Sequence, residues 1–86
     1  MHEMSIALEV CSIAEDHVGL EHLPHVVEVG LEVGDDAGVA FDSLEFCLEV
    51  VLTSPPFNQA KAVIHRVPGD VLRVSYLEVD DGRPND

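Results

Sequence analysis

The chain alternates between two kinds of residue over one short stretch, Val27-Glu28-Val29-Gly30-Leu31-Glu32-Val33-Gly34. On an extended backbone, successive side chains point to opposite faces. The odd-numbered positions here are all apolar, whereas the even-numbered positions hold glutamate or glycine. This period of two predicts a half-buried strand with one wet face.

A helical pattern precedes that strand. A helix is expected over residues 5–22, ended by Gly19 and then Pro24. Its apolar residues recur at steps of three and four positions, which places them on one side of a helix. The predicted stripe consists of Met4, Ala7, Leu8, Cys11, Ala14 and Val18.

A second helix is predicted after the strand, beyond a loop at residues 34–38 whose composition is that of a turn. Asp42 is its predicted N-cap, because Glu45 lies three residues later and the two have the spacing of a capping pair. Leu44, Leu48 and Val51, with Phe41 and Cys47 beside them, supply its apolar face. The run Thr53-Ser54-Pro55-Pro56 ends it.

Two further strands complete the pattern, at residues 61–67 and 72–79. The alternation of the last strand slips after Val74, which predicts a bulge near Ser75 and Tyr76. Residues 68–70, Pro-Gly-Asp, have the composition of a hairpin loop, so the two strands are expected to join as a hairpin.

These elements predict an α+β fold in the order α-β-α-β-β, with two helices packed on one face of a three-stranded sheet. Residues 1–80 are expected to form a single domain and residues 81–86 an acidic, solvated tail. One core is predicted to contain Leu8, Cys11, Val29, Leu31, Leu48, Ile64 and Val74.

The composition restricts the classes of partner. The 86 residues include 17 acidic and 4 basic side chains, for a formal net charge of −13. A field of this sign repels phosphate backbones and favours cations and basic protein surfaces, so nucleic acid is not expected as a partner. No apolar run reaches the roughly 20 residues of a membrane helix, and the start lacks the features of a signal peptide. We therefore expect a cytoplasmic protein in which Cys11 and Cys47 stay unpaired in an apolar setting.

The first residues, Met1-His2-Glu3, carry the most distinctive chemistry. A free α-amine with a pKa of about 7.7–8.0 can yield its proton to a metal near neutral pH. The amine, the His2 imidazole and the deprotonated amide nitrogen between them form two fused chelate rings. Three nitrogens of this kind suit square-planar Ni(II) or Cu(II), with a fourth donor from Glu3, water or another residue.

The same opening, Met1-His2-Glu3-Met4-Ser5 leading into a helix, resembles that of the HypA/HybF family of hydrogenase-maturation nickel metallochaperones. The similarity is collinear through residues 27–34, 37–39, 43–51 and 67–69, and it returns in residues 72–74 and 77–79. The resemblance implies that Met1, His2 and Glu3 bind Ni(II). It also implies that the partners are a hydrogenase large-subunit precursor or a HypB-type GTPase.

The resemblance has one large gap. Family members carry a zinc-ribbon domain with two Cys-x-x-Cys pairs between the proline-glycine turn and the last strand, whereas Asp70-Val71 crosses that position here. No Cys-x-x-Cys occurs in these 86 residues, so structural zinc is not expected. The missing domain leaves the oligomeric state open between a monomer and a homodimer.

Two functions compete at this point. The first is a nickel metallochaperone, which transfers metal and is not an enzyme. No nucleophile–base pair, phosphate loop or carboxylate dyad suggests catalysis. The second is a protein–protein adaptor or structural subunit of a hydrogenase-related complex that does not transfer nickel. A weaker alternative metal site consists of His17, His22 and His25, which could converge at the end of the first helix.

Overall fold

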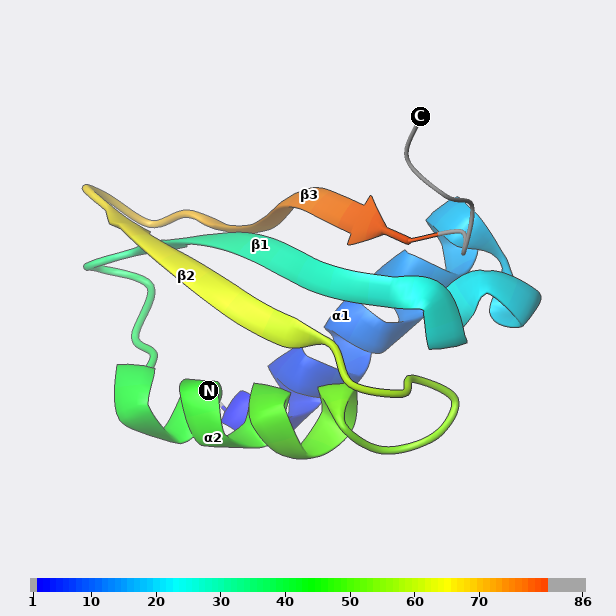
Figure 1. The fold of residues 1–86 in the computed structure, drawn as a ribbon. Helices are drawn as coiled ribbons and strands as arrows, with labels where there is room; N and C mark the ends of the chain where they lie inside the picture. Colours follow the sequence, from blue (N-terminus) through cyan, green and yellow to red (C-terminus); the bar gives the residue numbers. More distant parts are fainter. Residues whose placement is uncertain (1, 81–86) are drawn as a thin grey trace.

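The computed structural model describes residues 2–80, so Met1 and the predicted acidic tail at 81–86 lie outside the described residues. The elements are α1 (Glu3–Val18), the 3₁₀ helix η1 (Leu20–His25), β1 (Val26–Gly34), α2 (Phe41–Leu52), β2 (Lys61–Val67) and β3 (Leu72–Val79). Both long helices cover the same face of the sheet (Figure 1). The predicted α+β class and its α-β-α-β-β order are confirmed.

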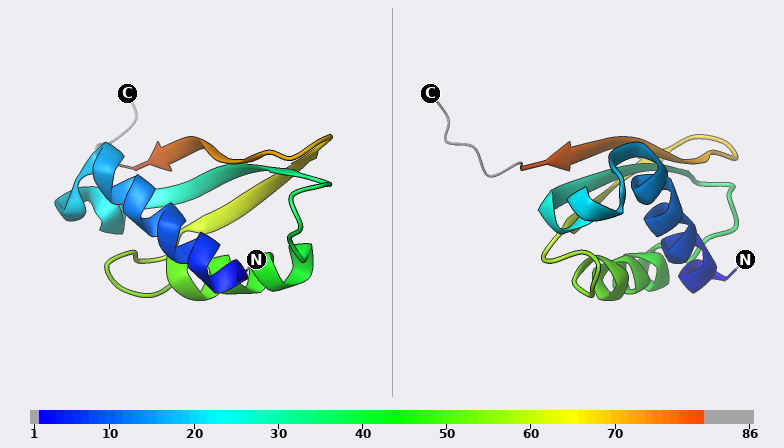
Figure 2. Two further views of the ribbon diagram at one scale, coloured as in Figure 1. Left: turned by 180° about the vertical axis from the view of Figure 1, so that it is seen from behind. Right: turned by 90° about the vertical axis from the view of Figure 1, so that its right-hand side faces the viewer.

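Two further views show the same two layers from behind and from the side (Figure 2). Among residues 2–80, no helix lies on the opposite face of the sheet in any of the three views. Within residues 2–80, no helix combines the length and apolarity needed to cross a membrane.

The strand order is β2-β1-β3, with β1 parallel to β2 and antiparallel to β3. The predicted hairpin between β2 and β3 is therefore wrong, because β1 lies between them. The physical reason is burial: Val29, Leu31 and Val33 of β1 are at most 1 % exposed, and a central strand is covered from both edges. The α2 helix supplies the crossover that two parallel strands require.

The connection at residues 68–71 passes the end of β1 instead of closing a hairpin. Three backbone nitrogens fasten it there: Gly34 N donates to Val71 O (2.6 Å), Asp35 N to Val67 O (2.9 Å) and Asp36 N to Gly69 O (3.0 Å). A Cβ on Gly34 would collide with the Gly69 carbonyl, so this crossing requires glycine at position 34.

The core forms where the two helices meet the sheet, and it corrects one predicted member. Val29, Leu31 and Leu48 are fully buried, and Cys11, Ile64 and Val74 are partly buried against that core. Leu8 is 55 % exposed. The buried side of α1 is centred on Ile6, Ala7, Val10 and Ala14. The predicted stripe is confirmed at Ala7 and Ala14, and Cys11 and Val18 are partly buried, but Met4 and Leu8 are exposed because the buried side of the helix is turned toward Ile6 and Val10.

The ends of α1 also differ from the prediction. The helix begins at Glu3 and stops at Val18, because Gly19 adopts a positive φ of 84°. Residues 20–25 then form η1 instead of continuing the helix to residue 22.

The predicted bulge in the last strand is confirmed. Gly30 pairs with Tyr76 and Leu31 pairs with Val74, which leaves Ser75 as the extra residue of β3.

The Tyr76 ring packs on the open face of the sheet. The ring of Tyr76 crosses from β3 onto β1 and occupies the space that a side chain at Gly30 would need. Its hydroxyl donates a hydrogen bond to Glu28, which also pairs with Lys61 at 3.5 Å. Glycine at position 30 therefore allows a side-chain contact across the exposed side of the sheet.

Candidate metal site at the chain start

His2 lies immediately before α1 and is exposed to solvent. Its backbone is extended (φ −86°, ψ 116°), and its carbonyl oxygen accepts the hydrogen bond of Ile6 N at 3.3 Å. The imidazole has no hydrogen-bond partner among the residues that the structure describes. Its ring nitrogens are therefore accessible from solvent.

The amide nitrogen of His2 stands at the N-cap position. The first N–H groups of a helix have no acceptor within the helix, because the residues that would accept from them are missing. Deprotonating this nitrogen breaks no bond of the helical ladder. The position is therefore compatible with an amide nitrogen that coordinates a metal.

Glu3 begins α1 and reaches across to the start of the other helix. Its Oε2 accepts a hydrogen bond from Ala40 N at 3.1 Å. This bond is the main cause that lowers the pKa of Glu3 below its ordinary value, and the Ser43 hydroxyl adds to the effect. The carboxylate is thus ionised and held at the N-terminus of α2.

That contact corrects the predicted cap of α2. The N-cap is Ala40 and the helix starts at Phe41, so Asp42 already lies within the first turn. Alanine has no side chain that can cap, and the acceptor comes from Glu3, 37 residues earlier. No local sequence signal marks Ala40 as the partner of Glu3, and sequence reasoning missed it.

The alternative histidine site is not assembled. The rings of His22 and His25 are 6.4 Å apart, and His22 lies 3.6 Å from Glu21. Residues 2–80 contain no group of three His, Cys, Asp or Glu side chains placed to hold a metal ion. Cys11 and Cys47 are free thiols. The chain start is the other predicted donor set, and its first member, Met1, lies outside the described residues.

A family model described as hydrogenase/urease nickel incorporation, metallochaperone, HypA matches residues 1–72. The chain belongs to the HypA family. It is 44 % identical over 69 residues to hydrogenase maturation factor HypA of Geobacter metallireducens. This match covers 80 % of this chain and 60 % of that protein. It is 35 % identical over 78 residues to HypA of Albidiferax ferrireducens, covering 91 % of this chain and 69 % of that protein.

The match to HypA of Azoarcus sp. is similar, at 41 % identity over 69 residues. The chain spans about 60 % of the length of the first two of these HypA relatives. The part matched by the family model includes the chain start, both helices, β1 and β2. The sequence match that shows membership in the HypA family therefore includes the elements that carry the candidate site.

Proposed function

We propose that this chain binds Ni(II) as cargo through Met1, His2 and Glu3 and serves nickel–iron hydrogenase maturation as a metallochaperone. The terminal amine, the His2 amide and the His2 imidazole supply three nitrogens for a square-planar ion. The observation that carries the proposal is the placement of His2, exposed and extended at the N-cap with an amide outside the helical ladder.

In this proposal Glu3 contributes a structural contact as well as a negative charge. Its hydrogen bond from Ala40 N joins the first turn of α1 to the start of α2. The ionised carboxylate also places negative charge beside a divalent cation. The fourth donor comes from Glu3, from water or from another residue.

The proposed role is transfer and not catalysis. We propose that the recipient is a hydrogenase large-subunit precursor or a HypB-type GTPase, encountered in the cytoplasm. An exposed site suits transfer, because an incoming ligand can displace water or a protein donor from the ion. We also propose that residues 1–80 form one nickel-binding domain without structural zinc.

Calorimetric titration of untagged protein with Ni(II) tests the site. One extra residue placed before Met1 converts the amine to an ordinary amide and leaves every side chain unchanged, so it should remove tight binding. His2→Ala should have the same effect because it deletes the imidazole. His22→Ala is the matched control, since it removes an exposed histidine far from the terminus and should preserve the affinity.

The extended protein decides between the two candidate functions. Unchanged nickel affinity after the extension would show that the terminal chelate does not form, and the adaptor function would then replace the metallochaperone. A site built from His17, His22 and His25, or a diffuse site on the acidic surface, would not respond to the extension.

A further inference from the structure

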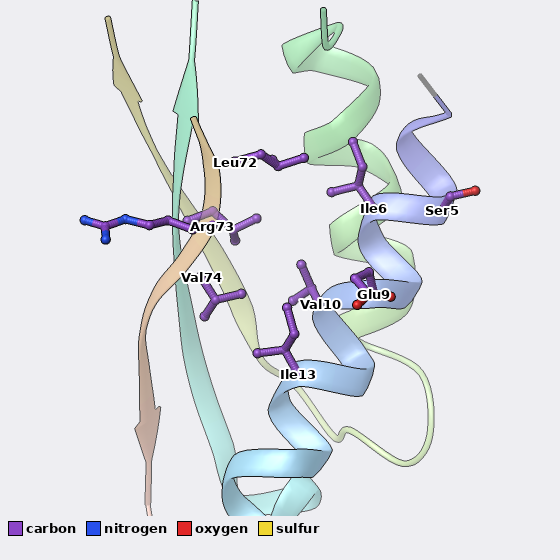
Figure 3. A pocket seen from close by; sticks show the side chains of 9 residues that line it. Ser5, Ile6, Glu9, Val10, Ile13, Leu72, Arg73 and Val74 are labelled. Carbon is purple, nitrogen blue, oxygen red and sulfur yellow. The ribbon is translucent and has the colours of Figure 1, made fainter. Parts of the chain in front are cut away.

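A groove runs between α1 and the neighbouring edge of the sheet. Its first hollow has a volume of about 280 Å³ and apolar walls, with Ile6, Val10 and Ile13 on α1 facing Leu72 and Val74 on β3 (Figure 3). A second hollow continues from Val74 toward His17 and Val18 at the end of α1. The groove therefore follows most of the length of α1.

The wall opposite α1 is an edge strand. β3 is hydrogen-bonded to β1 and stands at the end of the strand order, so its outer side has no neighbouring strand among residues 2–80. An open edge presents backbone N–H and C=O groups in a row, which an extended chain can pair with. Leu72 is 37 % exposed beside this edge, and Ile13 is half-buried across from it.

The charge at the groove is acidic. Glu9 lies at its mouth on α1, without a cationic partner among residues 2–80. Arg73 points away from the groove, toward the other face of the sheet, and pairs with Glu32 at 2.6 Å (Figure 3). The other two basic side chains in residues 2–80, Lys61 and Arg66, are also engaged in ion pairs. A ligand at this groove therefore meets negative charge that the described cations do not neutralise.

We propose that this groove binds an extended, basic segment of a partner protein, which adds to the edge of β3 as a fourth strand. Backbone hydrogen bonds to β3 would hold the segment, and every second side chain would enter the apolar groove. One of these inward side chains, at the mouth of the groove, would be lysine or arginine and would face Glu9. The bulge at Ser75 interrupts the edge, so pairing is assigned to Leu72–Val74, beside the first hollow.

Two features favour a basic partner segment over the other occupants. A second copy of this chain would bring another net charge of −13 to the contact. A helix could fill the hollow, but it would leave the backbone edge of β3 without partners. The inference does not depend on nickel binding, because none of the groove residues belongs to the terminal site.

Selection from a display library of random peptides on the untagged protein tests the proposal. The selected peptides should carry apolar residues at every second position and a net positive charge. In nuclear magnetic resonance titrations, the best of them should shift the amide signals of β3 and of the facing side of α1. Peptides with apolar spacings of three and four residues would instead indicate a helical ligand and overturn the proposal.

Variants locate the contact. Ile13→Lys should lower the affinity for the selected peptide by about tenfold or more. Phe46→Lys, at an α2 side chain that is 65 % exposed, should change that affinity by less than about twofold. Glu9→Lys keeps the apolar wall intact and should also weaken binding, with Glu49→Lys on α2 as its matched control. Equal losses in the groove variants and their controls would mean nonspecific attraction to the acidic surface. A dimer detected by light scattering, with exchange protection along β3, would assign the groove to a second copy and likewise overturn the proposal.

Discussion

The carboxylate of Glu3 accepts a hydrogen bond from Ala40 N at 3.1 Å and so joins the first residue of α1 to the N-cap of α2. The two residues lie 37 positions apart in the sequence. A side chain next to the proposed metal ligand thus also satisfies a helix terminus in another element. In the proposed function, Glu3 would therefore contribute both to stability and to nickel binding.

The first prediction concerns that contact. Glu3→Ala should lower the urea midpoint, because Ala40 N loses its acceptor. Glu3→Gln should lower it less, because the amide oxygen can still accept. Equilibrium unfolding followed by circular dichroism measures both, with Glu9→Ala as a control in the same helix. A loss in the control equal to that of Glu3→Ala would contradict the capping role.

The second prediction compares two leucines. Leu48→Ala should cost about 2–5 kcal/mol of unfolding free energy, because Leu48 is fully buried in the core. Leu8→Ala should change it by no more than about 0.5 kcal/mol, because Leu8 is 55 % exposed. Urea denaturation of both variants measures the difference. Similar losses would mean that α1 packs through the face centred on Leu8.

The third prediction concerns pH. The hydrogen bond to Glu28 raises the pKa of Tyr76, and the same bond lowers the pKa of Glu28. The stabilisation from Tyr76 is present below its unfolded pKa of about 10 and is lost as the pH rises through the higher folded value. The stabilisation from Glu28 is present above its unfolded pKa and is lost as the pH falls through the lower folded value.

Tyr76 is the single tyrosine of a chain without tryptophan, so tyrosinate absorbance reports on it alone. The folded protein should titrate above about 10, and Glu28→Gln should bring the midpoint back toward that value. A midpoint that Glu28→Gln leaves unchanged would show that the bond does not control the phenol.

The fourth prediction concerns zinc. Protein purified from zinc-containing medium and dialysed against a chelator should retain no stoichiometric zinc, because the sequence has no Cys-x-x-Cys pair and residues 2–80 hold no cluster of three ligands. Elemental analysis measures the content. One chelator-resistant zinc per chain would require a site formed with residues outside that range or between two copies.

The helices and strands could be predicted from periodicity, since β1 alternates and the apolar residues of the helices repeat at three and four positions. The pairing of the strands could not be predicted in this way. The composition of residues 68–70 favours a hairpin, but the burial of Val29, Leu31 and Val33 is decided by the tertiary structure, which places β1 between the other two strands. The Ala40 cap and the exposure of Leu8 have the same origin, because both depend on which elements meet in space.

The candidate site divides in a similar way. The residue types at positions 1–3 suggested the chelate from the sequence, because the chemistry is local to the chain start. The exposure and extended backbone of His2 came from the structure, and so did the engagement of Glu3 with a distant amide. Such long-range contacts leave no spacing that a single sequence reveals.

The separation of β2 from β3 by β1 has a consequence for how the chain tolerates change. No backbone hydrogen bond joins β2 to β3, so widening their connection at residues 68–71 breaks no strand pairing and disturbs only the contacts at Gly34, Asp35 and Asp36. Beyond these contacts, the cost of a longer connection is mainly loop entropy, which grows by only about 0.6 kcal/mol for each doubling of length. The end of β1 is therefore a permissive point, where a whole module can be gained or lost while the three strands keep their order.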